Sequence, residues 1–180
     1  LALAPPAYSR GPGRHAAPAA GCIGSDGCGG HGVGLDSCSS SERSLTPGVE
    51  VTTGPLGQGV ANSLGMALAE RWLAHRFNRP GHTIVDHFTY VFCSDGDLME
   101  GISHEAAELA GHQKLGKLLW IYDDNRISIE GDTSLATGID QRARFEAYGW
   151  QVLSVGDGND REAMGNAIET ARTRVDRPTL

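Results

Sequence analysis

The stretches FTYVFCSDGD (residues 88–97) and LLWIYDDN (residues 118–125) decide the fold. Each is a short apolar run that ends in acidic and turn-forming residues, which is typical of a buried strand leaving a sheet. If both runs are parallel strands, Asp95 and Asn125 emerge side by side at the carboxyl edge, where open α/β sheets bind ligands. Carboxylate and amide oxygens suit a Mg²⁺ ion that already carries phosphate oxygens. The pattern predicts a diphosphate cofactor held through a metal, with Gly96 allowing the backbone to turn tightly beside it.

These two residues also have an ordinary structural interpretation. Asp is a common cap of a following helix, and Asn commonly forms an Asx turn by bonding its own backbone two residues on. The residues alone leave both interpretations open for Asp95 and Asn125.

Helical and extended patterns alternate along the chain from Val51 onward. We expect helices over Val60–Phe77, about Ser103–Gln113 (with Ser103 as N-cap), Arg142–Tyr148 and Asp160–Val175, and strands over Phe88–Cys93, Leu118–Tyr122 and Gln151–Val155. This order predicts an α/β fold: a doubly wound, mostly parallel sheet with helices on both faces, here incomplete.

The N-terminal part of the chain has a different composition. Residues 1–50 contain ten Gly and five Pro but no Phe, Trp, Met, Lys, Asn or Gln. Such a segment buries too little apolar surface to offset its chain entropy, so we expect it to be disordered or irregular. We therefore divide the chain into a low-complexity segment, residues 1–45, and a domain, residues 46–180.

Charge and cysteine content limit the class of protein. The 180 residues carry a net charge of −7, which argues against nucleic acid or an anionic membrane as the main partner. No apolar run approaches the length of a transmembrane helix, and the first fifteen residues make a poor signal peptide. The four cysteines, Cys22, Cys28, Cys38 and Cys93, lack zinc-ribbon or CxxC spacing. We expect a reduced, cytoplasmic setting.

A glycine-rich loop, GPLGQG at residues 54–59, precedes the first helix. Glycines allow successive N–H groups to face an anion, and the helix adds its positive N-terminal end. The loop lacks the Gly-Lys-Ser/Thr of a P-loop and the order of the Rossmann fingerprint, so an ordinary glycine-rich turn is the alternative.

Other polar residues gather after the Asp-Gly turn. His104, Glu108 and His112 recur every four residues, but the sequence reads HEAAE rather than HExxH, which disfavours zinc. Glu100 and Glu105 are either solvated acids at a helix start or interface carboxylates.

Six segments together resemble transketolase in order and spacing. They are TTGPLGQGVANSLGMALAE (52–70), FNRPGH (77–82), VDHFTYVFCSDGD (85–97), MEGISHEAAELAG (99–111), LGKLLWIYDDNRISIEGD (115–132) and RFEAYGW (144–150). The resemblance covers the diphosphate-binding domain of that family, from about Thr46 to Leu180. The family's thiamine-diphosphate signature is normally Gly-Asp-Gly followed by Asn-Asn. Ser94 and Asp124 depart from it and leave both side-chain ligands intact.

The resemblance implies a site and an activity. Asp95, Asn125 and the backbone carbonyl of Ile127 would ligate Mg²⁺ (or Ca²⁺). Thiamine diphosphate would contact Gly54, Pro55, Leu56, Gly96 and Asn125, and Glu100 and Glu105 would lie at the interface of a homodimer. The implied reaction, that of the pentose phosphate pathway, transfers a two-carbon ketol unit between ketose and aldose phosphates.

The family also has parts that this sequence does not show. A pyrimidine-binding domain supplies the glutamate that activates the cofactor, and nothing here corresponds to it. We expect a partial transketolase that is inactive alone. The alternatives are a non-catalytic or split subunit that needs a separate pyrimidine-binding domain, a related thiamine enzyme such as dihydroxyacetone synthase, or a plain metal-binding domain. We also predict that residues 1–45 are not native family sequence.

Overall fold

A pair of parallel strands forms the centre of the computed structural model, which describes residues 49–128 and 131–180. Strand β1 (Thr89–Ser94) pairs with β2 (Leu118–Asp123), and the register runs from Thr89 opposite Leu118 to Ser94 opposite Asp123. Both strands therefore end at the same level, so the residues that follow them share one edge. This confirms the two predicted strands; the predictions for residues 1–45 lie outside the described residues.

Two short extended segments continue the sheet beyond β2. The Trp120 N–H donates to the Thr179 carbonyl at 2.8 Å, and the Gln151 N–H donates to the Pro178 carbonyl at 2.9 Å. The predicted strand Gln151–Val155 is wrong as a regular strand, since Gln151 forms only a single bridge to Thr179. Its neighbour in the sheet is the run 178–180: the Leu180 N–H donates to the Gln151 carbonyl and the Leu153 N–H to the Leu180 carbonyl, each at 2.9 Å.

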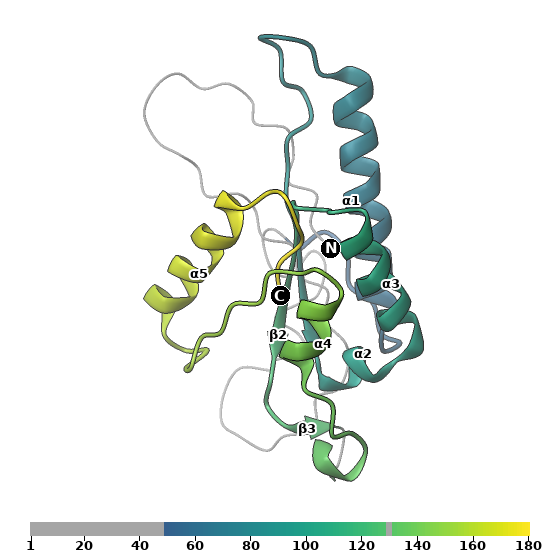
Figure 1. Cartoon of the computed structure of the whole chain (residues 1–180), viewed down its shortest axis with the longest axis vertical. Coiled ribbons are helices and arrows are strands. Elements are labelled where there is room, and N and C mark those ends of the chain that lie inside the picture. Colours follow the sequence, from purple (N-terminus) through teal and green to yellow (C-terminus); the bar gives the residue numbers. More distant parts are fainter. Residues whose placement is uncertain (1–48, 129–130) are drawn as a thin grey trace.

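Helices cover both faces of this sheet, which confirms the predicted fold class (Figure 1). Helices α1 (Gln58–Phe77), α3 (Gly101–His112) and α4 (Gln141–Ala147) pack on the face that carries Val91 and Trp120. Helix α5 (Arg161–Thr173) packs on the opposite face, against Tyr90 and Leu119. Successive strand residues thus point to opposite layers, as the pleat requires.

The remaining elements are short. Helix α2 (Asp95–Met99) follows β1 directly, and β3 (Ile127–Ser128), β4 (Gly131–Asp132) and a 3₁₀ turn (Thr133–Leu135) follow β2. The prediction of Ser103 as an N-cap is wrong, because α3 already begins at Gly101. The Ser103 hydroxyl instead donates to the Asp97 carbonyl, so it fastens α3 to α2.

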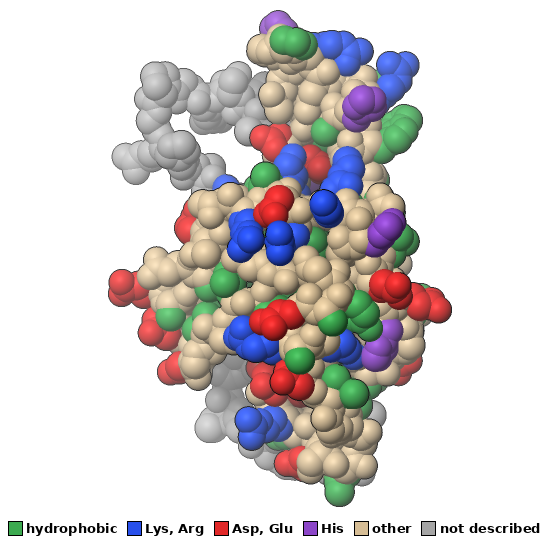
Figure 2. Space-filling model, in the orientation of Figure 1, with side chains coloured by type: hydrophobic (Ala, Val, Ile, Leu, Met, Phe, Trp, Pro, Cys, Tyr) green, Lys and Arg blue, Asp and Glu red, His purple; other side chains and the backbone are tan. Residues whose placement is uncertain are grey.

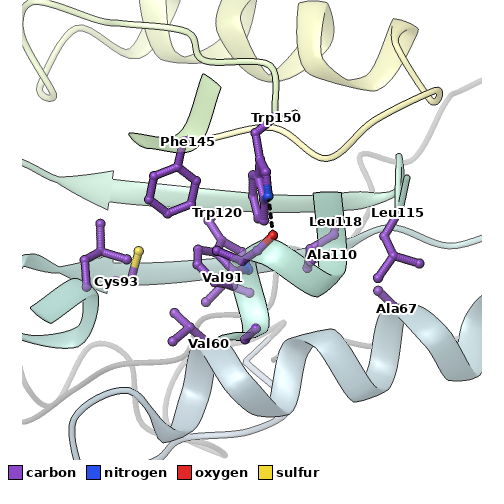
Figure 3. Packing of buried hydrophobic residues seen from close by; sticks show 13 residues of the cluster. Val60, Ala67, Val91, Cys93, Ala110, Leu115, Leu118, Trp120, Phe145 and Trp150 are labelled. Atoms are coloured by element: carbon purple, nitrogen blue, oxygen red, sulfur yellow. Dashed lines mark hydrogen bonds between the residues drawn. The ribbon is translucent and has the colours of Figure 1, made fainter. Parts of the chain in front are cut away.

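Aromatic rings fill the core on the α1, α3 and α4 face (Figure 3). The Trp120 ring lies 4.7 Å from the Trp150 ring and 5.7 Å from the Phe145 ring, between centroids. The Trp150 indole N–H donates to the Ala107 carbonyl of α3 at 2.8 Å. The tryptophans thus bury large apolar surfaces while their polar atoms remain bonded.

Substituting Gly111 by Ala should destabilise the domain. A Cβ at this position would lie 1.8 Å from the Tyr148 carbonyl oxygen, a backbone atom that cannot yield without moving the Tyr148–Trp150 segment. Forced overpacking of this kind costs about 1–3 kcal/mol. Chemical denaturation of Gly111→Ala measures the loss. Gly165→Ala on α5 is the control, because a Cβ there meets open space.

Candidate functional site

The Asp-Gly turn at the carboxyl edge is the start of helix α2. Ser94 is its N-cap, and the Asp97 side chain completes a capping box with it. Asp95 is the first helical residue and is only 4 % exposed. Its Oδ2 atom is buried without a hydrogen-bond partner among the described residues. Asp95 is therefore not the cap, and one of its carboxylate oxygens remains available to a cation.

The other oxygen of this carboxylate is bonded by Tyr122. The Tyr122 hydroxyl donates to Asp95 Oδ1, and it also lies 3.4 Å from Asp124 Oδ1. Burial, followed by the hydrogen bond to Asp95, raises the pKa of Tyr122 well above its usual value. The phenol therefore remains a proton donor at neutral pH, and it fixes the orientation of the Asp95 carboxylate.

The glycine-rich loop lies directly against this turn. A Cβ on Gly96 would lie 3.2 Å from the terminal carbons of Leu56, and the Gly57 N–H donates to Asp97 Oδ1 at 2.9 Å. The structure thus brings together two motifs that are distant in sequence. It also corrects one expectation: the N–H of Gly57 bonds a carboxylate of the chain, and that of Gln58 bonds the Pro55 carbonyl, so neither is available to a phosphate group.

Helix α1 begins at this loop with an open N-terminus. Its N-cap, Gly57, provides no side-chain bond, and its first turn contains no acidic residue. The nearest carboxylate is that of Asp97, which accepts the N–H of Gly57, so the positive field of this helix end is partly offset by a charge of the chain itself.

The turn after β2 carries Asn125. Its Oδ1 accepts the Ile127 N–H at 2.9 Å and its Nδ2 donates to Asp123 Oδ2 at 3.1 Å. The Asx turn is therefore present. An amide oxygen has two lone pairs, so this bond leaves one for a metal. Arg126 adopts a left-handed conformation, with φ 59°, which costs an L-residue roughly 1–2 kcal/mol.

A cleft of 1130 Å³ opens from this edge along the α5 face of the sheet. Asp95, Tyr122 and Asp124 are among its polar lining residues, and Val152 and Ile168 are among its apolar ones. The glycine-rich loop and Asn125 are not among its lining residues. The polar junction at the edge, rather than the whole cleft, therefore carries the candidate site.

The histidines and glutamates at and near α3 lie on its half-buried or exposed surface. His104 contacts Arg144, with 3.1 Å between His104 Nε2 and Arg144 Nη1, and burial followed by that cation lowers its pKa. Glu108 and His112 are exposed. Within the described residues no three His, Cys, Asp or Glu side chains are grouped to hold a metal, so the described part offers no zinc cluster. Glu100 and Glu105 are exposed as well.

Sequence reasoning missed three residues of this junction: Asp97, Tyr122 and Arg144. Asp97 was detectable, since Ser94 and Asp97 have the three-residue spacing of a capping box. Tyr122 reads as one more residue of an apolar strand. Arg144 donates to the Leu98 carbonyl at 3.1 Å across 46 residues, and no local pattern signals that contact.

Taken together, a parallel α/β sheet with an acidic turn and a glycine-rich loop at its carboxyl edge defines a cofactor-binding domain of the open-sheet class. The family model described as transketolase, thiamine diphosphate binding domain, matches residues 24–180. The chain belongs to this family. The match begins within the glycine- and proline-rich segment.

Similar proteins are transketolases. The transketolase of Streptococcus pyogenes is 58% identical over 139 residues, which are 77% of this chain and 19% of that protein. That of Geobacillus stearothermophilus is 56% identical over 139 residues, covering 77% of this chain and 21% of the relative. This chain thus spans about a fifth of the length of the curated relatives it matches.

Solved structures agree with this assignment. Transketolase from Leishmania mexicana superposes with a TM-score of 0.72 at 52% identity, over 77% of this chain and 21% of that one. A Pichia stipitis transketolase in complex with sedoheptulose-7-phosphate gives a TM-score of 0.72 at 49% identity, over 75% of this chain and 20% of that one.

Across the described ranges, no helix has the length and apolar character needed to span a membrane.

Proposed function

We propose that this chain provides the metal- and diphosphate-binding part of a transketolase that transfers a two-carbon ketol unit between ketose and aldose phosphates. The observation that carries the proposal is the buried Asp95 carboxylate, whose unpartnered Oδ2 lies at the carboxyl edge. A buried carboxylate oxygen without a partner is costly unless a cation or donor compensates it.

The donor set fits Mg²⁺ bound to a diphosphate. The proposed ligands are the Asp95 carboxylate, the Asn125 amide oxygen and the Ile127 backbone carbonyl, which are hard oxygen donors. The proposed cofactor contacts are Gly54, Pro55, Leu56, Gly96 and Asn125. Two contacts support them: Leu56 packs on Gly96, and the Gly57 N–H donates to Asp97 Oδ1, so the loop lies against the Asp-Gly turn.

Thiamine diphosphate, when bound, supplies the carbanion that attacks a ketose carbonyl and the electron sink for the product of that attack. The residues of this chain bind and orient. Asp95 would contribute negative charge for the metal, and the hydrogen bond from Tyr122 holds that carboxylate in place. The glycines of the loop have no side chains, so a diphosphate could approach the backbone closely. Sugar phosphates are the proposed substrates.

The assembly and location are proposals as well. The exposed Glu100 and Glu105 suit the interface of a homodimer in a full-length protein, since Glu100 is the N-cap of α3 and lies against Gly57 of the loop, and Glu105 follows within the same helix. Basic and acidic side chains are interspersed over the face shown in Figure 2, and with the net charge of −7 this supports neither a nucleic acid nor a membrane partner. A cytoplasmic location and a domain boundary after residue 45, with non-native sequence before it, remain predictions.

Calorimetric titration with thiamine diphosphate and Mg²⁺ tests the proposal. The chain is titrated alone and after co-expression with a transketolase pyrimidine-binding domain, because that domain supplies the other half of the family's pocket. We expect saturable binding that disappears when EDTA removes the metal. Absence of binding in both preparations would contradict the proposal. Ketol transfer by the co-expressed pair would favour a split enzyme.

A further inference from the structure

Asp97 links three segments at the candidate site, two through its side chain and one through its backbone carbonyl. Its Oδ1 accepts the Gly57 N–H at 2.9 Å, and its Oδ2 accepts the Ser94 N–H at 2.9 Å and the Ser94 hydroxyl at 3.2 Å. Its carbonyl accepts the Ser103 hydroxyl. The residue is 4 % exposed. A single buried carboxylate thus bonds the end of β1 and the loop before α1, while its backbone bonds α3.

A carboxylate satisfies both segments where an amide would not. Each oxygen of an ionised Asp accepts hydrogen bonds, whereas an Asn in the same place has one acceptor and one donor group. An amide would therefore turn its NH₂ toward either the Gly57 N–H or the Ser94 N–H, and leave that group unpaired. A buried unpaired N–H carries the full desolvation penalty, so the affected loop has to move.

The loop side of this link is fixed by close packing. Gly57 has φ 77°, and a Cβ there would lie 2.7 Å from the Cβ of Glu100. Gly57 thus fits against the α2–α3 junction only without a side chain, with its N–H aimed at Asp97. Two constraints, one steric and one polar, set the same loop position.

We infer that Asp97 is a positioning residue that holds the glycine-rich loop against the metal-bearing turn. Its carboxylate sets the affinity for a diphosphate–Mg²⁺ complex without itself touching the metal or the phosphates. Both residues that Asp97 connects are next to proposed ligand-binding residues. Asp95, with its unpartnered oxygen, lies two residues before Asp97, and Leu56, which packs on Gly96, lies next to Gly57. This inference rests on the proposed function.

Asp97→Asn tests the inference through binding and through local exchange. In the preparation in which the wild type binds thiamine diphosphate with Mg²⁺, we expect the Kd to rise roughly tenfold to a hundredfold. Amide hydrogen exchange should quicken at Gly57 or at Ser94 by roughly tenfold or more. The control is Glu108→Gln on the exposed face of α3, which removes one negative charge and should leave both readouts unchanged.

Gly57→Ala provides the second variant, because it displaces the loop while keeping the carboxylate. We expect it to weaken binding to a similar degree, and the double variant with Asp97→Asn to lose less than the sum of the two effects. If the two substitutions weaken binding additively, Asp97 does not act through the position of Gly57, and the inference is overturned. If Asp97→Asn does not fold, wild-type affinity in a folded Gly57→Ala would overturn it by itself.

The outcomes separate this inference from the proposed function. A wild-type chain that binds no thiamine diphosphate, alone or with the pyrimidine-binding domain, contradicts the function. Tight binding by the wild type and equally tight binding by Asp97→Asn, with faster exchange at Gly57, overturns only the positioning role.

Discussion

Asp95→Asn is expected to abolish metal-dependent binding of thiamine diphosphate while leaving the fold as stable as before or more so. The substitution removes the only charged group among the three proposed ligands. Loss of a group that merely supports a metal ligand costs 10–100-fold in affinity, so loss of the carboxylate ligand itself should cost roughly a hundredfold or more.

The stability of the metal-free protein should respond in the opposite direction. Asp95 Oδ2 is buried and unpartnered, and a buried charge without compensation is unfavourable. Asn has nearly the same shape, and its amide oxygen still accepts the Tyr122 hydroxyl that now bonds Asp95 Oδ1. The stability of the metal-free protein therefore distinguishes two roles. Removing a carboxylate that serves only to bind a ligand leaves that stability unchanged or raises it, whereas removing a structural carboxylate lowers it.

Thermal melting with and without Mg²⁺ and thiamine diphosphate measures both effects. The wild type should gain stability on adding the two ligands, and Asp95→Asn should not. Asp86→Asn is a matched control, because Asp86 is exposed and pairs with Lys117 at 2.6 Å, before β1 begins. A large fall in apo stability of Asp95→Asn, with ligand stabilisation retained, would show that Asp95 acts structurally.

The strands and their shared edge were predictable because their signals are local. Apolar runs that stop at Asp-Gly and Asp-Asp-Asn mark both the strands and their ends, and parallel pairing follows from the intervening helix. Residues 151–155 show the limit of that reasoning. They have an extended pattern, and the segment with which they pair is 178–180, a partner that sequence spacing does not reveal.

The composition of the site was predictable in part. Asp95, Gly96 and the glycine-rich loop were found from turn chemistry, and the structure joins them through Gly57 and Asp97. That contact spans 40 residues, so it follows from the packing of α1 rather than from any motif. Asn125 illustrates the converse, because its Asx turn and its proposed role at a metal use the same oxygen.

Trp120→Ala is expected to destabilise the domain by about 3–5 kcal/mol, the range for truncating a buried aromatic side chain. Trp120 lies on β2, is 2 % exposed, and packs against the rings of Phe145 and Trp150. Its indole N–H donates to Ser63 Oγ of α1 at 2.9 Å. One ring thus joins the sheet to α1 and to the segment around α4, so its removal leaves a cavity that three elements cannot easily fill.

Urea denaturation of two further tryptophan variants separates the causes. Trp120→Phe keeps an aromatic ring and leaves Ser63 bonded to the Val60 carbonyl, so it should cost clearly less than Trp120→Ala. Trp72→Ala removes an equal side chain that is 61 % exposed on α1, and its effect should be within about 1 kcal/mol. Equal losses for Trp72→Ala and Trp120→Ala would contradict a core built around Trp120. Because β2 ends at the turn that carries Asn125, loosening this core should also weaken metal-dependent cofactor binding.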